Sequence, residues 1–437
     1  MTVDINFIFH KSCGPFHYQG LMHFHTLYFY DFIRDYVSPI DPDFKIDTKY
    51  KITVVKRFKD IKPLSKCMNV IFIPMNYPLI TSIEHNEPTM LEDLYRLDDL
   101  PNVKLVMDYN NETLLPGNFD PTGKTGFVGE MDHSRFYCTT YGWDRYNVKD
   151  VLPFKKIIGN MIYTFYWLSK AIEEQPYITK PDLIYTYPGK QTPIRYFVPS
   201  NMFRPNRAQC IVQMHEKNML FDSEWNMNKF NDFFNFREIQ KEQNTFEPEP
   251  YVEEYLRLFG STPRYNSWPW KSTYNKKRVL EDQGHLDYHA GMFDSYHSID
   301  PDLLNNILIY IVQETFSDYK GEEPNDPSKP MYVMDITEKT WKGFLYGIPM
   351  FLNARPYSIE RIENHGFDML TDYYKFDYDK ELDLTKRLNL MLESAQEFPT
   401  PNKDMVDRMK HNKNKLVSKE YLWNAQKEFL EIMLDKK

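Results

Sequence analysis

The chain has 437 residues, a net charge of -9, and hydrophobic and aromatic contents of 42% and 16%. This length exceeds what one hydrophobic core usually supports, so we expect two domains, and the apolar content excludes a globally disordered chain. The acidic balance argues against a constitutive nucleic-acid binder, because affinity for the phosphate backbone comes from clustered Lys and Arg, although a local basic groove stays open. The Lys- and Arg-rich stretch 403–419 is interpreted as the solvated face of a helix.

In the first half, short β-branched or aromatic runs alternate with longer helical stretches. The runs are 5–9, 52–55, 70–74, 103–108, 136–139 and 183–186. Helices are expected at 21–36 and 156–175, and the stretch 186–193 is the best candidate for a linker because it holds Pro188, Gly189 and Pro193. Such alternation predicts βα units and a mainly parallel sheet.

The second half continues this alternation. Strands are expected at 194–199 and 307–312, and helices at 208–216, 230–242 and 251–259. After residue 380 the pattern predicts two helices, which Phe398-Pro-Thr-Pro401 separates.

The stretch 331–370 is the most informative part of the chain, because it reads as a loop, a short helix, a buried strand and a second helix. Thr337 suits the N-cap of the first helix, which Gly347 and the following Ile-Pro end. A helix N-terminus attracts phosphate, and Lys339 adds a positive charge there. Glu338 would be repelled by a diphosphate and is expected to accept hydrogen bonds from ribose hydroxyls. The alternative is a helix N-terminus with ordinary charges.

Two blocks of sequence resemble a known group of enzymes. Ile336-Thr337-Glu338-Lys339, preceded by Tyr310-Ile-Val-Gln-Glu314-Thr and followed by Gly347-Ile-Pro349, resembles the nucleotide-sugar signature of fucosyltransferase-like glycosyltransferases and related enzymes of tailed phages. A second block, Arg195-Tyr-Phe-Val-Pro-Ser-Asn201-Met-Phe-Arg204-Pro-Asn-Arg207, is similar to the start of the C-terminal domain in this group. Together the blocks cover roughly residues 194–370, and residues 103–112 carry a weaker likeness.

The resemblance implies an α/β fold of the GT-B type, with two Rossmann-like domains facing a cleft. The expected domains are an N-terminal acceptor domain at 1–190, a C-terminal nucleotide-sugar domain at 191–400, and a segment at 401–437 whose helix crosses back to the first domain. The implied activity is inverting, metal-independent transfer of a sugar from a UDP- or GDP-linked donor to a hydroxyl, without a further cofactor. The acceptor stays open between a glycan, a protein and a modified phage DNA base. The alternative is a non-catalytic phage binding or structural protein that retains the fold.

Within this interpretation, the donor is expected to contact residues at the ends of strands. Arg204 and Arg207 follow a strand and precede the predicted helix at 208–216, where a guanidinium can bind a departing diphosphate, and the sequence does not rank the two. Glu314 lies at the carboxyl edge of a parallel sheet, where ligands of open α/β sheets bind. A surface ion pair is the alternative for either arginine, and a strand-end cap is the alternative for Glu314.

Inverting transfer also needs a general base, which is expected from the N-terminal domain. Glu112, within Asp-Tyr-Asn-Asn-Glu after a strand, resembles the acidic residue at this place in related phage enzymes, and His10 ends the first strand. Solvated loop residues are the alternative for both.

Metal binding is not expected. The His285 and His289 pair has no evident further ligands, and the triplets Asp41-Pro-Asp43 and Asp300-Pro-Asp302 suit turns.

The cellular setting follows from the cysteines and the apolar runs. The four cysteines are far apart and form no metal spacing, which indicates reduced thiols. The N-terminus has no features of a signal peptide, and no apolar run approaches the roughly 20 residues of a membrane helix. The sequence therefore predicts a soluble protein without a membrane partner, located in the cytoplasm, which is the host cytoplasm if a phage encodes the chain.

Overall fold

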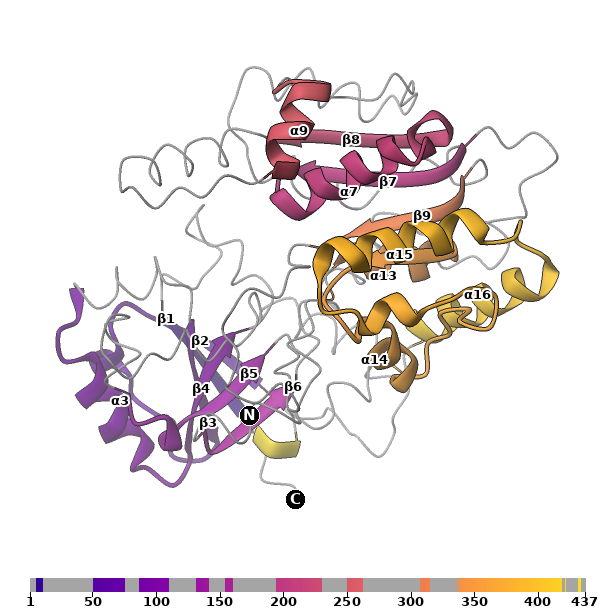
Figure 1. Cartoon of the computed structure of the whole chain (residues 1–437). Coiled ribbons are helices and arrows are strands. Elements are labelled where there is room, and N and C mark those ends of the chain that lie inside the picture. The colour runs from indigo at the N-terminus through magenta and orange to yellow at the C-terminus, as the bar shows by residue number, and fades with distance from the viewer. Residues whose placement is uncertain are drawn as a thin grey trace, which may run out of the picture. The chain divides into compact units, whose positions relative to one another are not determined.

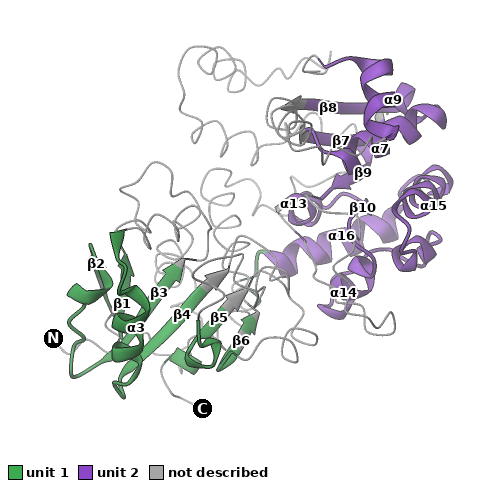
Figure 2. Cartoon of the chain, turned by 60° about the vertical axis from the view of Figure 1, so that its left-hand side comes forward, with its two compact units in different colours: residues 1–170, 321–334, 417–437 green, residues 171–320, 335–416 purple. Residues whose placement is uncertain are grey.

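The computed structural model describes residues 5–10, 50–74, 86–109, 131–140, 154–159, 194–229, 250–261, 307–314, 336, 338–418, 421 and 431–433. The described elements form an α/β structure with two sheets of parallel strands (Figure 1). The chain divides into two compact units (Figure 2). Unit 1 comprises Met1–Lys170, Gly321–Met334 and Val417–Lys437, and unit 2 comprises Ala171–Lys320 and Asp335–Leu416.

Unit 1 contains a sheet with the strand order β2-β1-β3-β4-β5-β6. Its strands are β1 (Ile5–His10), β2 (Tyr50–Val55), β3 (Met68–Pro74), β4 (Val103–Tyr109), β5 (Tyr137–Thr140) and β6 (Lys156–Gly159). The described helices of this unit are the 3-10 turns η4 (Phe58–Asp60) and η6 (His133–Arg135) and the α-helix α3 (Met90–Asp98).

The core of unit 1 follows from the apolar patterns of these elements. Every residue of β1 is buried, as expected for a central strand that is covered on both faces. Helix α3 buries Met90, Leu94 and Leu97, which lie on one helical face, and it packs against β4 and η4. These residues join the same apolar cluster as Phe58 and Phe136.

Most strand predictions for unit 1 are confirmed, with boundaries that shift by one or two residues. The prediction of a helix at 156–175 is wrong for its first residues, because residues 156–159 form the strand β6. Two β-branched residues favour a strand there, and the segment pairs in parallel with β5, with Cys138 opposite Ile157. The predicted strand at 183–186, the helix at 21–36 and the linker at 186–193 lie outside the described residues.

Unit 2 contains a sheet with the strand order β10-β9-β7-β8. Its strands are β7 (Ile194–Met202), β8 (Ser223–Lys229), β9 (Ile307–Gln313) and β10 (Met350–Asn353). Its described helices are α7 (Pro205–Glu216), η9 (Met219–Asp222), α9 (Pro250–Phe259), α13 (Glu338–Tyr346), α14 (Ser358–Asn364), η10 (Asp377–Lys380), α15 (Leu384–Glu397) and α16 (Lys403–Leu416). Helix α7 packs against α9 and α15, whereas α13 packs against α16.

Two predictions for unit 2 need correction. Helix α7 begins at Pro205 and not at residue 208, so Arg207 lies inside its first turn. Proline is favoured at this first helical position because its fixed φ suits the helix and its missing N–H would have no partner there. The stretch 403–419 is not simply a solvated helix face, because Lys413 is buried, and this burial lowers the pKa of its amine to about 8. The predicted helix at 230–242 and the N-cap Thr337 lie outside the described residues.

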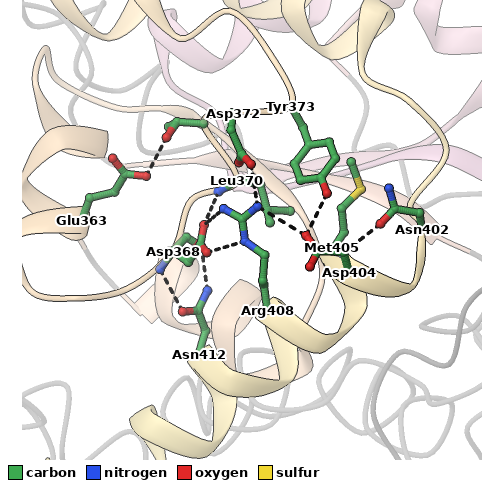
Figure 3. Close-up of polar contacts among 11 residues, drawn as sticks. Glu363, Asp368, Leu370, Asp372, Tyr373, Asn402, Asp404, Met405, Arg408 and Asn412 are labelled. Atoms are coloured by element: carbon green, nitrogen blue, oxygen red, sulfur yellow. Dashed lines mark hydrogen bonds and ion pairs between the residues drawn. The ribbon is translucent and has the colours of Figure 1, made fainter.

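A polar cluster ties α16 to the segment after α14 (Figure 3). The Arg408 guanidinium donates to both carboxylate oxygens of Asp368, at 2.5 and 2.7 Å, and to Asp372 at 2.8 Å. Asn412 accepts a hydrogen bond from the Asp368 N–H at 2.8 Å and donates to its carbonyl at 2.6 Å. Since α16 in turn packs against α13, this cluster helps to fix the position of α13 in unit 2.

The last part of the chain groups with unit 1, whereas α16 groups with unit 2. In unit 1, the Lys104 amine of β4 donates a hydrogen bond to the carbonyl of Ile432. The domain boundaries at 190 and 400 stay a prediction. Across the residues that the structure describes, no helix combines the length and apolarity that crossing a membrane requires.

Candidate functional site

Both sheets contain the same change of direction in their strand order. In unit 1 the chain passes from β1 to β2 on one side and then to β3 on the other, and in unit 2 it passes in the same way from β7 to β8 and then to β9. Ligands of open parallel sheets bind at the carboxyl ends of the strands at such a switch point. The end of β1 and the ends of β7 and β9 are therefore the places to examine.

In unit 2, the end of β7 leads directly into α7. Arg204 is the N-cap residue of this helix, with an extended backbone (φ -146°, ψ 151°), and its own side chain makes no capping hydrogen bond. Arg207 is buried, and its guanidinium donates to the carbonyl of Glu314 at 3.5 Å. Arg204 is only half-buried. The two arginines therefore differ: Arg207 holds the main chain at the end of β9, and Arg204 flanks a helix N-terminus.

Glu314 follows β9 and connects three elements of unit 2. Its side chain is fully buried, and one carboxylate oxygen accepts a hydrogen bond from the Thr340 hydroxyl at 2.7 Å. Its main-chain N–H donates to the carbonyl of Asn353 at 3.1 Å. Glu314 thus fixes the first turn of α13 against the carboxyl ends of β9 and β10.

Behind Glu314 lies a buried network of neutral polar groups. The Gln313 amide donates to the Cys210 sulfur at 2.9 Å and accepts from the Asn353 amide at 2.6 Å. The Asn206 amide donates to the Glu314 carbonyl at 3.4 Å. Burial raises the pKa of the Cys210 thiol to about 12, so this cysteine stays protonated and is no nucleophile at neutral pH. The network orders this edge of the sheet.

The helix N-termini at this edge are not equivalent. The buried Asp379 carboxylate accepts hydrogen bonds from the N–H groups of Ile359 and Glu360, at 3.1 and 3.2 Å, at the start of α14. An anionic ligand cannot use donors that a carboxylate already engages. A phosphate is therefore not expected at the start of α14. At the start of α7 the side chain of the N-cap residue Arg204 makes no capping hydrogen bond, and the first turn of α13 carries the half-buried Lys339.

The structure places only some of the predicted donor residues. Arg207 contacts the carbonyl of Glu314 at the switch point of unit 2, Arg204 is the N-cap residue of the same helix, and Lys339 lies in α13 next to Thr340. Thr337 and the side chain of Glu338 lie outside the described residues, so their roles stay predictions.

Sequence reasoning missed several residues of this site. They are Asn206, Gln313, Thr340, Asn353 and the half-buried Arg355, which follows β10 at the same edge. Two of them share a signal, because Gln313 and Asn353 are each a polar residue at the end of an apolar run, in Ile-Leu-Ile-Tyr-Ile-Val-Gln and Met-Phe-Leu-Asn. A polar residue that ends a buried strand could have identified Gln313 and Asn353.

In unit 1, His10 occupies the end of β1 and is buried. Its Nε2 lies 2.8 Å from Oε1 of Glu87, which is also buried. The other oxygen of Glu87 accepts a hydrogen bond from the Phe58 N–H at 2.7 Å, and the imidazole stacks on the Phe58 ring with 5.3 Å between centroids. Glu112, the other candidate base, lies outside the described residues.

The residues considered for metal binding, His285, His289 and the two Asp-Pro-Asp triplets, also lie outside the described residues. Among the residues that are described, no three His, Cys, Asp or Glu side chains are grouped so that they could hold a metal ion.

Comparison of the chain with protein-family models, curated proteins and solved structures found no match. Function is therefore inferred from the residues and the topology alone.

Proposed function

We propose that the protein is a glycosyltransferase of the GT-B type, whose unit 2 binds a nucleoside-diphosphate sugar and whose sugar is transferred to an acceptor hydroxyl. The observation that carries this proposal is the switch point of the second sheet. There the first turn of α7, through Asn206 and Arg207, and the first turn of α13, through Thr340, both contact the buried Glu314, and Arg204 is the N-cap residue of α7. Such an arrangement of backbone donors and cationic side chains suits a ligand with several negative charges.

The positive groups also suit the chemistry of the transfer. When the bond between the sugar and the diphosphate breaks, negative charge grows on the leaving oxygen, and preorganised donors stabilise it. We assign this role to Arg204 and Lys339, and we assign Arg207 to support of the main chain. In this proposal the side chains supply the positive charge without a metal ion, and Glu338 receives the ribose hydroxyls.

The identity of the donor and acceptor is a separate part of the proposal. The donor is UDP- or GDP-linked, no further cofactor takes part, and inversion at the sugar carbon requires a base for the acceptor hydroxyl. His10 and Glu112 are the candidates for that base. Glycans, proteins and modified DNA bases all offer suitable hydroxyls.

The first test uses thermal shift and calorimetry to measure binding of uridine, guanosine, UDP, GDP and the corresponding hexose donors. A ligand present at 100 times its dissociation constant should stabilise the protein by about 2.7 kcal/mol. The proposal would be overturned if none of these ligands binds. Binding without turnover of any donor would favour a non-catalytic protein that retains the fold.

The second test varies the cationic residues. Arg204→Gln and Lys339→Ala should lower the affinity for nucleoside diphosphate far more than the affinity for nucleoside, because each removes a proposed contact to phosphate. The matched control is Arg257→Gln in α9, where the arginine is exposed and pairs with Glu254 one turn earlier. This control should bind all ligands as the wild type does. If the two site variants lose equal affinity for nucleoside and for nucleoside diphosphate, these residues support only the fold.

A further inference from the structure

Unit 1 carries a row of exposed cationic side chains, which we call the basic ridge. It consists of Lys56, Arg57, Lys59, Lys62 and Lys66, and all five are exposed. Asp60 is the single acidic residue between the first and the last of them, so the stretch 56–66 has a net charge of +4 in a chain whose net charge is -9. The acidic composition of the whole chain thus conceals a local excess of positive charge.

The basic ridge lies on the connection from β2, the edge strand of the first sheet, to β3 (Figure 2). Both strands pair in parallel with β1, so this connection has to return from the carboxyl ends of the strands to their amino ends. Phe58 and Ile61, three residues apart, are buried in the apolar cluster of unit 1. Lys59 and Lys62 each follow directly after one of them and are exposed. The connection therefore has a buried apolar side and an outer cationic side.

The lysines of the basic ridge are not used by the fold. In α16, by contrast, Arg408 binds Asp368 and Lys415 donates to two main-chain carbonyls. On the ridge, Arg57 pairs with Asp60 at 3.1 Å, whereas the four lysines have no hydrogen bond or ion pair within the described part of the chain. Like charges that stand close together repel one another, so this excess lowers stability unless an anion offsets it. A solvated helix face, the usual interpretation of a charged run, does not describe this connection.

One end of the basic ridge lies at the switch point of the first sheet. The Phe58 ring stacks on the imidazole of His10, the last residue of β1, with 5.3 Å between centroids. Since a strand rises about 3.3 Å per residue, a connection that returns along β3 spans about 20 Å. One strand of a nucleic-acid duplex has about six phosphates over this length of its axis. Four lysines without a partner along such a length suit a linear polyanion better than a single phosphate.

We propose that the basic ridge binds the phosphate backbone of a nucleic acid. Its lysines would replace the counterions of successive phosphates without reading the sequence. A narrow strand can contact the ridge alone, because charges more than about 8 Å away are screened at physiological salt. A lipid bilayer is a broad anionic surface that would also meet acidic groups such as the exposed Glu92 of α3, which packs beside η4. The apolar side chains of the ridge, Phe58 and Ile61, are buried and cannot insert into a bilayer.

The consequence for the acceptor rests on the proposed function, whereas binding by the ridge does not. If the chain transfers a sugar, a polyanion held on the ridge leads to the switch point of unit 1, which is the expected acceptor unit. A nucleic acid then ranks above a glycan or a protein as the carrier of the acceptor hydroxyl.

The experiment measures binding of the full chain to labelled duplex DNA, single-stranded DNA and RNA of one length by fluorescence anisotropy. If all four lysines contact phosphates, the logarithm of the affinity for duplex DNA should fall with the logarithm of the salt concentration with a slope of about -3.6. This slope corresponds to a loss of about 150-fold between about 50 and 200 mM salt. Comparison of the three ligands shows whether DNA or RNA is preferred.

A triple variant and a charge-matched control localise the binding. The changes Lys59→Gln, Lys62→Gln and Lys66→Gln together should reduce the slope to about -0.9, because one lysine of the four remains. The control combines Lys375→Gln, Lys386→Gln and Lys403→Gln, which remove the same charge from exposed positions of unit 2 and should keep the wild-type slope. Circular dichroism checks that both variants are folded, and the single variant Lys62→Gln, with an expected slope of about -2.7, serves if the triple variant is not.

The proposal is overturned if the wild type binds no nucleic acid, or if the triple variant and the control have the same slope. Equal or tighter binding of heparin or of phosphatidylserine vesicles would also overturn it, because the ridge would then be a surface for other polyanions or for membranes. UDP and GDP binding, measured by calorimetry, should be the same in the triple variant and the wild type. Nucleic-acid binding without nucleotide binding would refute the proposed function and leave the ridge, and the reverse result would refute only the ridge.

Discussion

The hydrogen bond between Thr340 and Glu314 offers a direct test of how unit 2 fixes α13, which carries part of the proposed donor site. Thr340→Val keeps the size and branching of the side chain but removes the hydroxyl that donates to the buried carboxylate at 2.7 Å. A hydrogen bond to a charged group contributes about 1.5 to 3 kcal/mol, and the buried partner loses this donor without gaining water. We expect the free energy needed to separate α13 from the end of β9 to fall by this amount.

Hydrogen exchange measured by mass spectrometry reads this effect locally. Where exchange proceeds by opening of α13 and β9, a loss of this size should raise the rates in their peptides by roughly 10- to 150-fold. Local measurement is preferable to a single unfolding curve, because a chain with two compact units need not unfold in one step. The affinity for nucleoside diphosphate should fall together with the protection of α13.

Thr385→Val supplies the matched control in the same unit. The Thr385 hydroxyl accepts a hydrogen bond from the Gln209 amide, also at 2.7 Å, but this pair is neutral and only partly buried. Its loss should cost about 0.5 to 1.5 kcal/mol and leave nucleotide affinity unchanged. Equal, small changes in both variants would refute the idea that Glu314 anchors α13. A large rise in exchange at α13 with unchanged affinity would show that this helix does not hold the nucleotide.

Three further perturbations test other parts of the structure. Burial raises the pKa of the Asp379 carboxyl from 3.8 to about 6, so the folded chain binds a proton at Asp379 more tightly than the unfolded chain does. The free energy of unfolding should therefore fall by about 3 kcal/mol as the pH rises from about 4 to 6. In urea unfolding curves, Asp379→Asn should remove this fall, and a variant with the wild-type pH dependence would exclude Asp379 as its source. Lys104→Met removes the hydrogen bond to the Ile432 carbonyl and should loosen the C-terminal segment, which limited proteolysis would detect as faster cleavage. An unchanged cleavage rate would show that this hydrogen bond is dispensable. Arg408→Lys should lower stability by only about 1 kcal/mol, because the partly exposed pair is screened by water, and a loss that is insensitive to salt would contradict this electrostatic account.

The sequence predicted the elements of both sheets well where the strands are buried on both faces. Continuous apolar runs such as those of β1 and β9 leave little ambiguity. The strand β8 was missed because its sequence, Ser-Glu-Trp-Asn-Met-Asn-Lys, is mostly polar, and among its described side chains Trp225 and Met227 are the buried ones. The strand β6 was assigned to a helix because its two isoleucines suit either structure. In both cases the neighbouring strand decides, and a pattern within one segment does not contain that information.

Pairs of residues that meet across the fold were beyond the reach of local patterns. Glu314 was predicted at a sheet edge, but its partner Thr340 looked like an ordinary residue inside a helix. Arg204 and Arg207 could not be ranked, because their difference depends on where α7 begins and on the carbonyl that the Arg207 guanidinium reaches. Local spacing identifies residue types that suit a role, whereas only the strand order shows which of them can meet.

Glu87 shows this limit most clearly. In the sequence it stands in Asn-Glu-Pro-Thr, a turn-like segment that gives no reason to choose it over any other surface carboxylate. Glu87 lies next to His10 only because β3 returns beside β1, which brings the start of α3 to the end of the first strand. The same reversal of strand order in unit 2 brings the end of β9 beside β7 and its arginines. In each unit the same topological feature, the switch point of a parallel sheet, thus brings together polar residues that are far apart in the sequence.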